Sequence, residues 1–323
     1  MAIFDRKNGA KAPKPEGSVA TAEKPVEQQE QSKFRLYIPL LGVLIGISLL
    51  LYPVFATRHN DVEQQKRANS YAVELGEVDG NTLEKSLADA DRYNEDLRQG
   101  VILDPFIKDV APDSEQYQAY LKQLDVSTAM SQVKVPVANV NLPVYHGTFD
   151  DTLQKGIGHL FGSSLPVGGD STHAVLTGHT GLPNATMFDN LTKVKEGDAF
   201  YLNTAGRAMK YVVNDIRIVE PSNVESLGRV EGKDLVTLIT CTPYGVNSHR
   251  LLVTGERVPL DPVEEKAVTE PEEVKAHWSW WMFVLLGGAI LSAILMLGAI
   301  ARLVIIMRRE NEEEESSAHP END

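Results

Sequence analysis

The sequence of 323 residues contains a single cysteine, Cys241. One thiol cannot form a disulfide within the chain, and one thiolate cannot build a cysteine-rich metal site. The histidines also lack the HExxH-type spacing of zinc peptidases, and nothing in the sequence resembles a calcium-binding loop. We therefore expect a fold that is stable without disulfides and a site without a metal or another cofactor.

Positive charge is scarce as well. The chain has 31 Lys and Arg against 45 Asp and Glu, a net charge of −14. Residues 57–279 alone contain 21 basic and 33 acidic side chains, a difference of −12. A surface this acidic repels polyanions, which argues against nucleic-acid binding. A solvated acidic surface is the simplest interpretation of this charge, although it would also tolerate a basic partner.

Two long stretches lack charged residues altogether. Residues 36–56 and 280–301 each have about the 20 mainly apolar residues that a membrane-spanning helix needs. We predict a transmembrane helix at each. A cleaved signal peptide is the alternative for the first, because Val54-Phe55-Ala56 offers small residues for a peptidase. Its apolar core is longer than that of a signal peptide, however, and a polar arm precedes it.

Basic residues next to these stretches predict how the chain crosses the membrane. They are Lys33, Arg35, Arg302, Arg308 and Arg309. Because flanking Lys and Arg prefer the cytoplasm, we expect both termini inside and residues 57–279 outside. Residues 1–35 have almost no large apolar residues before the span and are predicted to be a disordered cytoplasmic arm. Residues 302–323, rich in glutamate, are predicted to be a solvated cytoplasmic tail.

Residues 57–132 have a helical pattern. Apolar side chains recur at helical spacing over 61–75, and a second helix is expected from a capping-box-like start at Asn81 to a stop at Gly100. A short helix is expected over 117–124. This part of the chain is therefore predicted to be a helical appendage between the membrane and the β-rich region.

From Val133 the pattern changes to short β-rich runs separated by Gly, Pro, Asn and Asp. The expected strands are 133–137, 142–145, 174–177, 199–202, 209–219, 235–240 and 251–258. Many short strands at this spacing favour a closed barrel or a sandwich over a parallel α/β sheet. Residues 261–279, rich in Asp, Glu, Pro and Lys, are predicted to be an extended linker that returns to the membrane.

Cys241 lies where a strand-like run ends. Residues 235–240 are apolar or β-branched, a turn containing Pro and Gly follows, and a second apolar run begins at Leu251. If these strands pair, the short link makes them antiparallel and brings Cys241 and Arg250 to the same end of the sheet. A buried, unreactive cysteine is the alternative, since a lone cysteine often behaves as a small hydrophobe.

A thiol that attacks an amide needs a neighbour that takes its proton, and histidine is the obvious type. Five histidines lie away from the spans and the tail: His146, His159, His173, His179 and His249. His179 has the most suitable local setting, because a strand opens there into a glycine-flanked loop; a surface or core histidine is the alternative. Arg250 carries a planar fork of donors that suits an oxyanion or a peptide carbonyl, although it could be an ordinary surface arginine.

The run Thr237-Leu238-Ile239-Thr240-Cys241 resembles the TLxTC signature of sortases. The continuation from Thr242 to Leu251 resembles class C, the pilin-polymerising branch, and the similarity extends over roughly 133–258. The resemblance implies a mainly β, β-rich α+β fold. Its catalytic domain would be a closed eight-stranded β-barrel over residues 133–260, with the helical appendage carrying a lid and the two transmembrane helices flanking both.

The resemblance also implies roles for particular residues. Cys241 would be the nucleophile, His179 the general acid and base, and Arg250 the group that orients the substrate or holds the oxyanion. His179 lies in Thr177-Gly178-His179-x-Gly181-Leu182-Pro183, which matches the family motif, although Thr180 stands where class C members commonly have a basic residue. Asp104, Pro105 and Phe106 resemble the Asp-Pro-aromatic lid of class C, which lies across the active-site groove.

The activity implied is that of a cysteine transpeptidase. It would cleave an LPxTG-like sorting signal between Thr and Gly through a thioacyl intermediate and transfer the product to a pilin lysine, so assembling pili on a Gram-positive surface. The partners would be pilin subunits and, in the alternative of a sortase that anchors single proteins, cell-wall precursor peptide. A membrane-tethered barrel without catalysis is a further alternative, and it predicts a buried, unreactive Cys241.

Overall fold

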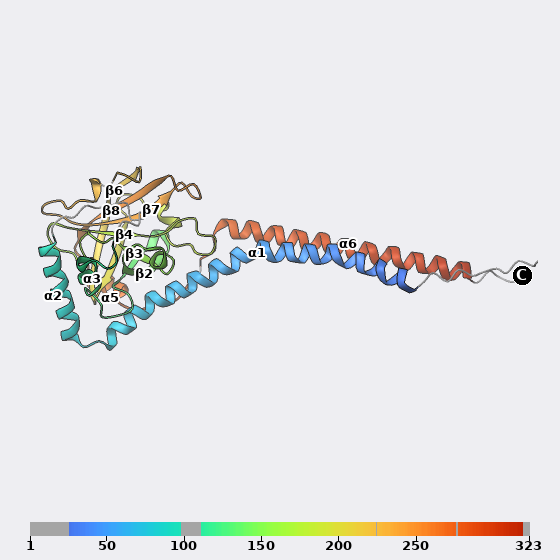
Figure 1. Cartoon of the computed structure of the whole chain (residues 1–323), viewed down its shortest axis with the longest axis horizontal. Coiled ribbons are helices and arrows are strands. Elements are labelled where there is room, and N and C mark those ends of the chain that lie inside the picture. The colour runs from blue at the N-terminus through green and yellow to red at the C-terminus, as the bar shows by residue number, and fades with distance from the viewer. Residues whose placement is uncertain (1–25, 98–110, 224, 276, 319–323) are drawn as a thin grey trace, which may run out of the picture. The chain divides into compact units, whose positions relative to one another are not determined.

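The structure is a computed structural model that describes residues 26–97, 111–223, 225–275 and 277–318. The chain divides into two compact units, residues 49–289 and residues 1–48 with 290–323. The first unit contains the β-barrel and the helices packed on it, and the second contains the remaining parts of the long helices α1 and α6 (Figure 1).

The helices are α1 (Val26–Glu77), α2 (Gly80–Asp96), α3 (Glu115–Leu121), α4 (Asp150–Leu153), α5 (Pro262–Thr269) and α6 (Trp280–Ala318), and short 3₁₀ turns are η1 (Pro136–Ala138), η2 (Asp189–Lys193) and η3 (Glu225–Leu227). Helix α1 joins the first predicted span and the predicted helix over 61–75 into one element. It begins inside the arm predicted to be disordered, because the Glu, Gln and Lys residues from Val26 onward favour helix and extend it. Helix α6 likewise continues into the predicted tail.

The segment predicted as an extended linker, 261–279, contains helix α5. Asp261 Oδ1 accepts hydrogen bonds from the backbone N–H groups of Val263 and Glu264, each at 2.9 Å, and the Glu264 side chain accepts from the Asp261 N–H. This reciprocal capping box, with Pro262 in the first turn, starts a helix within an acidic, proline-containing sequence. The prediction was wrong because it weighed the composition of the segment and not this local motif.

The eight strands are β1 (Ser131–Val135), β2 (Val140–His146), β3 (Ile157–His159), β4 (Thr172–Thr177), β5 (Ala199–Thr204), β6 (Arg207–Val219), β7 (Asp234–Thr242) and β8 (His249–Val258). They form a closed barrel in the order β1-β2-β3-β4-β7-β8-β6-β5. The β2–β3 and β4–β7 pairs are parallel, and the other pairs are antiparallel. The predicted eight-stranded barrel is therefore confirmed.

Strand β1 ends earlier than predicted. The expected strand over 133–137 included Pro136, which instead begins the 3₁₀ turn η1. Proline has no N–H to donate to a ladder, and Asn139 then adopts a left-handed conformation with φ 52° that reverses the chain into β2. The reversal pairs Val135 directly with Val140.

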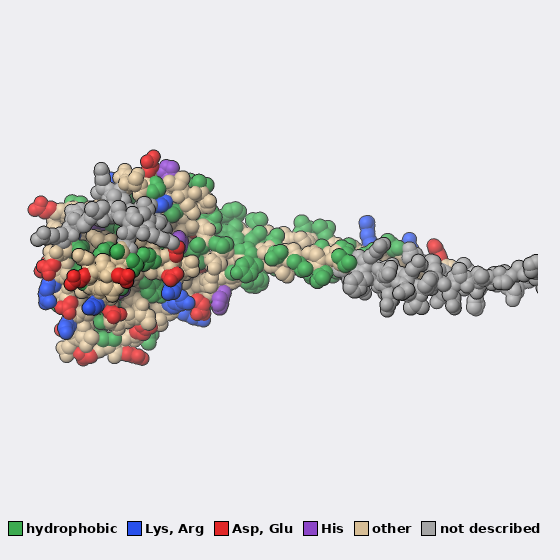
Figure 2. Space-filling model, viewed as in Figure 1, with side chains coloured by type: hydrophobic (Ala, Val, Ile, Leu, Met, Phe, Trp, Pro, Cys, Tyr) green, Lys and Arg blue, Asp and Glu red, His purple; other side chains and the backbone are tan. Residues whose placement is uncertain are grey.

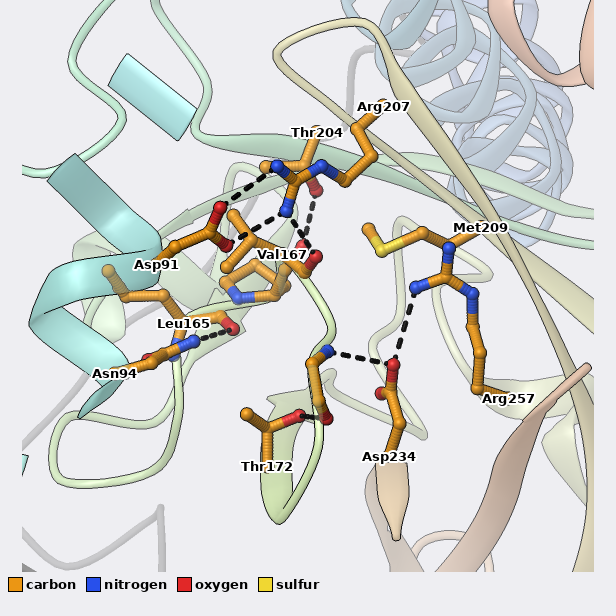
Figure 3. A network of polar contacts seen from close by, with 12 residues as sticks. Asp91, Asn94, Leu165, Val167, Thr172, Thr204, Arg207, Met209, Asp234 and Arg257 are labelled. Atoms are coloured by element: carbon orange, nitrogen blue, oxygen red, sulfur yellow. Dashed lines mark hydrogen bonds and ion pairs between the residues drawn. The ribbon is translucent and has the colours of Figure 1, made fainter. Parts of the chain in front are cut away.

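Helix α2 is attached to the barrel through polar contacts with the β3–β4 loop (Figure 3). The Asn94 side chain donates to the Leu165 carbonyl at 3.1 Å and accepts from the Leu165 N–H at 2.7 Å. Nearby, Arg207 makes two hydrogen bonds to the Asp91 carboxylate, at 2.9 and 3.0 Å, and a third to the Val167 carbonyl at 2.9 Å. Because Asn94 and Leu165 are buried, water cannot replace this amide pair.

We therefore expect Asn94→Ala to lower the free energy of unfolding by about 1–3 kcal/mol, since it leaves the buried N–H of Leu165 without its partner, while the Leu165 carbonyl keeps a hydrogen bond of 2.8 Å from the Val167 N–H. Arg92→Ala on the same helix is the matched control. Its ion pair with Asp89 is exposed, so its loss should cost roughly 0.5 kcal/mol or less. Denaturant titrations of the full chain in detergent measure both values, and equal losses for the two variants would contradict the account.

Helices α1 and α6 each contain a stretch long and apolar enough to cross a membrane. Within their most apolar windows the mean hydropathy is 2.3 and 2.5, and only 6% and 0% of the residues are buried. Figure 2 shows hydrophobic side chains gathered along these helices, whereas acidic and basic side chains lie over the barrel and α2. Among the described residues, the barrel has no exposed apolar stretch of this length. The two exposed apolar stretches in α1 and α6 therefore indicate a membrane-anchored protein.

Candidate active site

The strand register makes Cys241 and Arg250 direct neighbours across two strands. Strands β7 and β8 are antiparallel, as predicted, and Cys241 is the direct partner of Arg250 in the ladder. Residues directly opposite each other have Cα atoms about 4.5–5.5 Å apart and side chains on the same face of the sheet. The thiol and the guanidinium therefore begin at the same end of two neighbouring strands and on the same face.

His179 reaches the same level from the other side of β7. Strand β4 runs parallel to β7, with Thr177 paired to Ile239. The Gly178 N–H donates to the Ile239 carbonyl at 3.0 Å, and the Thr240 hydroxyl donates to the Gly178 carbonyl at 2.8 Å. Continued by one more residue along each chain, this alignment would bring His179 level with Cys241. Cys241 and Arg250 thus lie in the neighbouring strands β7 and β8, and His179 lies in the loop that follows β4, the strand on the other side of β7.

Cys241 and Arg250 lie on the outer face of the barrel wall. Val236 and Leu238 of β7, with Leu251 and Val253 of β8, belong to the main core. The alternate residues Ile239 and Leu252 instead belong to a separate cluster that also contains Leu160, Val175 and Leu227. Cys241 follows Ile239 by two residues on the same face, and Arg250 precedes Leu252 by two. This outer cluster is the apolar layer that continues directly into the candidate site.

The strands change from buried to partly exposed where they reach the candidate site. Every residue from 172 to 178 and Thr180 is buried, but His179 is partly exposed. On β7 every residue from 235 to 240 is buried, but Cys241 is partly exposed. Arg250 is also partly exposed, and its guanidinium donates to the carbonyls of Asn247 and His249 at 3.2 and 3.3 Å. Reactants can therefore reach all three side chains.

The other candidate histidines have different surroundings. His159 and His173 are fully buried and bonded at both ring nitrogens, His159 to Tyr120 and Ser164 and His173 to Gly228 and Thr237. Burial lowers the pKa of His159 to about 4, so its ring stays neutral. His146 bonds the Gln123 carbonyl at 2.7 Å, and the exposed His249 bonds Ser248. Of the five, His179 alone combines partial exposure with a place level with Cys241.

Two opposing effects act on the pKa of His179. Burial, the larger effect, lowers it from the ordinary value, and the Asp150 carboxylate at the start of α4 acts in the opposite direction. The lowered pKa keeps the imidazole neutral at neutral pH, the form that can accept a proton from a thiol. Sequence reasoning missed Asp150, which lies far from His179 along the chain and belongs to no motif.

We expect Asp150→Asn to lower the pKa of His179 further, because it removes the charge that favours the imidazolium. Asp151→Asn, on the same exposed turn, is the matched control and should change that pKa less, since Asp150 is the carboxylate whose charge raises the pKa of His179. An NMR titration of the His179 ring resolves the two variants, and added salt should shrink their difference. Equal titration curves at low salt would show that Asp150 does not act on the imidazole.

Two further findings complete the site. Within the described residues no group of three or more His, Cys, Asp or Glu side chains could hold a metal ion. The predicted lid residues Asp104, Pro105 and Phe106 lie outside the described residues.

Comparisons with known proteins match this architecture. A family model described as "Sortase domain" matches residues 133–258. The chain is 31% identical over 147 residues to Sortase A of Staphylococcus aureus, which covers 44% of this chain and 69% of that protein. It spans a smaller share of other curated relatives, for example 58% of Sortase A of Streptococcus agalactiae.

Solved structures match more than half of the chain. Sortase C-1 from Actinomyces oris is 58% identical, with a TM-score of 0.53, and the match covers 55% of this chain and 99% of that chain. Sortase C of Streptococcus pneumoniae is 44% identical, with a TM-score of 0.53, over 58% of this chain and 93% of that chain. Given this barrel and these relatives, the chain belongs to the sortase family.

Proposed function

We propose that the protein is a membrane-anchored cysteine transpeptidase of class C. The observation that supports the proposal is the strand register, which pairs the partly exposed Cys241 with Arg250 on one side and, on the other, aligns the end of β4, two residues before the partly exposed His179, with Ile239. A sulfur nucleophile, a proton acceptor and a fixed cation are the three groups that acyl transfer through a thioester requires.

In the first half-reaction, Cys241 Sγ attacks the carbonyl carbon of the Thr–Gly bond in an LPxTG-like signal. The S–C bond forms as the C–N bond breaks, and the thiol proton passes through His179 to the departing glycine amine. Arg250 donates hydrogen bonds to the carbonyl oxygen as it gains negative charge. The product is a thioacyl enzyme and a free amine-terminated peptide.

In the second half-reaction, an incoming amine attacks the thioester carbon. A new N–C bond forms, the S–C bond breaks, and the proton lost by the amine returns through His179 to the sulfur. For this chain we propose a lysine of a pilin subunit as the amine. The solved relative from Streptococcus pneumoniae is described in terms of pilin substrate specificity, and one from Group B Streptococcus is named for a pilus island.

We further propose that both apolar stretches span the cell membrane, with the two termini in the cytoplasm and the barrel outside. The proposal rests on the two apolar helical stretches and on the Lys and Arg residues beside them in the sequence. In this arrangement the catalytic domain is attached at both ends to the surface on which secreted substrates arrive.

A competition between acceptors tests the function. The full chain in nanodiscs is given an LPxTG peptide together with equal concentrations of a pilin subunit and a cell-wall precursor peptide, and the products are separated by mass. We expect isopeptide products on pilin lysines to dominate, with none from a scrambled donor peptide. Dominant wall-peptide products would instead identify an anchoring sortase, and no product with either acceptor would refute transpeptidation.

A further inference from the structure

The residues that hold the His179 loop are not part of any sortase-like motif in this sequence. The loop leaves β4 at Gly178 and ends at η2. A hydrogen bond of 3.1 Å from the Phe188 N–H to the His179 carbonyl joins its two ends. Residues 180–184 contain glycine, proline, Leu182 and small polar residues, whereas Ala185, Met187 and Phe188 are buried in the main core. The stretch 180–184 has many accessible conformations unless other groups fix it.

Asp189 fixes the start of this loop. Its Oδ1 atom accepts from the Gly181 N–H at 2.8 Å and from the Thr180 hydroxyl at 2.9 Å, the two residues that follow His179. Gly181 has φ +75°, a conformation that favours glycine, and its backbone lies against Gly245 in the turn after Cys241. One carboxylate oxygen of Asp189 therefore fixes Thr180 and Gly181, the two residues between His179 and the contact with the β7–β8 turn.

Asp61 of α1 fixes the far end of the same loop. Its two carboxylate oxygens accept from the Thr186 N–H at 2.9 Å and from the Thr186 hydroxyl at 2.6 Å. The preceding residue, Asn60, donates to the Asn184 carbonyl at 2.8 Å, and Thr57, one helical turn closer to the span, donates to the Pro183 carbonyl at 3.5 Å. The helix residues that directly follow the first apolar stretch in the sequence thus hold the loop through main-chain and side-chain groups.

From these contacts we propose that Asp189 and Asp61 are positioning residues that hold His179 in register with Cys241. Asp189 acts on the two residues after His179, and Asp61 ties the loop to the helix that continues from the membrane-spanning segment. Neither carboxylate touches the reacting atoms. The proposal rests on the proposed function, in which His179 carries the proton.

The test compares variants of the full chain in nanodiscs by peptide transfer and by hydrogen exchange at the amides of Gly181 and Thr186. Asp189→Ala and Asp61→Ala remove the acceptors, whereas Asp189→Asn and Asp61→Asn keep an acceptor oxygen. Asp261→Ala is the matched control, because Asp261 also receives two donors on one oxygen but caps α5. It should lower thermal stability and leave kcat within about twofold of the wild type.

We expect each alanine variant to lower kcat about 10-fold with KM changed less than about twofold, because misplacing a catalytic group acts on the chemical step. The amide of Gly181 in Asp189→Ala, and that of Thr186 in Asp61→Ala, should exchange faster than in the wild type, and both asparagine variants should recover at least half of kcat. Unchanged kcat or unchanged exchange in the alanine variants would overturn the proposal. Turnover that survives Cys241→Ala would instead refute the proposed function, while the exchange results would still stand.

Discussion

Replacing Cys241 with alanine is expected to abolish transpeptidation. The rate should fall by about 10⁴-fold or more, to the uncatalysed background, because no other cysteine exists in the chain to form the thioester. The fold should survive the change, since the side chain is partly exposed and the interior face of β7 is built from Val236 and Leu238. Turnover of an LPxTG peptide in the presence of a pilin subunit measures the loss.

The thermal midpoint of the variant separates loss of chemistry from loss of structure, and it should stay close to that of the wild type. Cys241→Ser is a second variant of nearly the same size. It should also be inactive, because a hydroxyl beside a neutral imidazole is a far weaker nucleophile than a thiol. Turnover near the wild-type rate in either variant would remove the thiol from the mechanism.

Replacing His179 with alanine is expected to have the second largest effect, a decrease in kcat of about 10²- to 10⁴-fold, the usual contribution of a general acid and base. His249→Ala is the matched control. His249 is exposed, pairs with Thr242 in the ladder and lies next to Arg250 in the sequence, so it is near the site without being level with Cys241. Its loss should leave kcat within about twofold.

Single-turnover measurements show which step of the reaction His179→Ala slows. The formation of the thioacyl enzyme should slow, because the thiol loses the group that takes its proton and the leaving amine loses its donor. If His179→Ala kept its rate while His249→Ala lost it, the proton-transfer role would belong to His249, and the register argument would be wrong.

The sequence was informative about strand pairings that a short connection determines. The run that ends at Cys241 and the one that begins near Arg250 are joined by a short turn, so their antiparallel pairing follows from the connection alone. The barrel followed from the number and spacing of short strands. Only β3, with three residues over Ile157–His159, was absent from the expected strands, because such a short run carries no measurable periodicity.

The contacts that complete the site are distant in sequence and could not be derived from local pattern. The parallel pairing of β4 with β7 brings Thr177 beside Ile239, and only this pairing makes His179 level with Cys241. Asp61 and Thr186 are separated by 125 positions, and neither residue belongs to a recognisable motif. Loop-closing contacts of this kind depend on the closed barrel and on α1 packing against it, which periodicity does not encode.

The most direct test of the central claim is the intact mass of the full chain after incubation with an LPxTG peptide and no acceptor amine. The account predicts one adduct with the mass of the peptide up to its threonine, mapped by digestion to Cys241 and released by hydroxylamine. The absence of an adduct, or an adduct mapped to a residue other than Cys241, would contradict it.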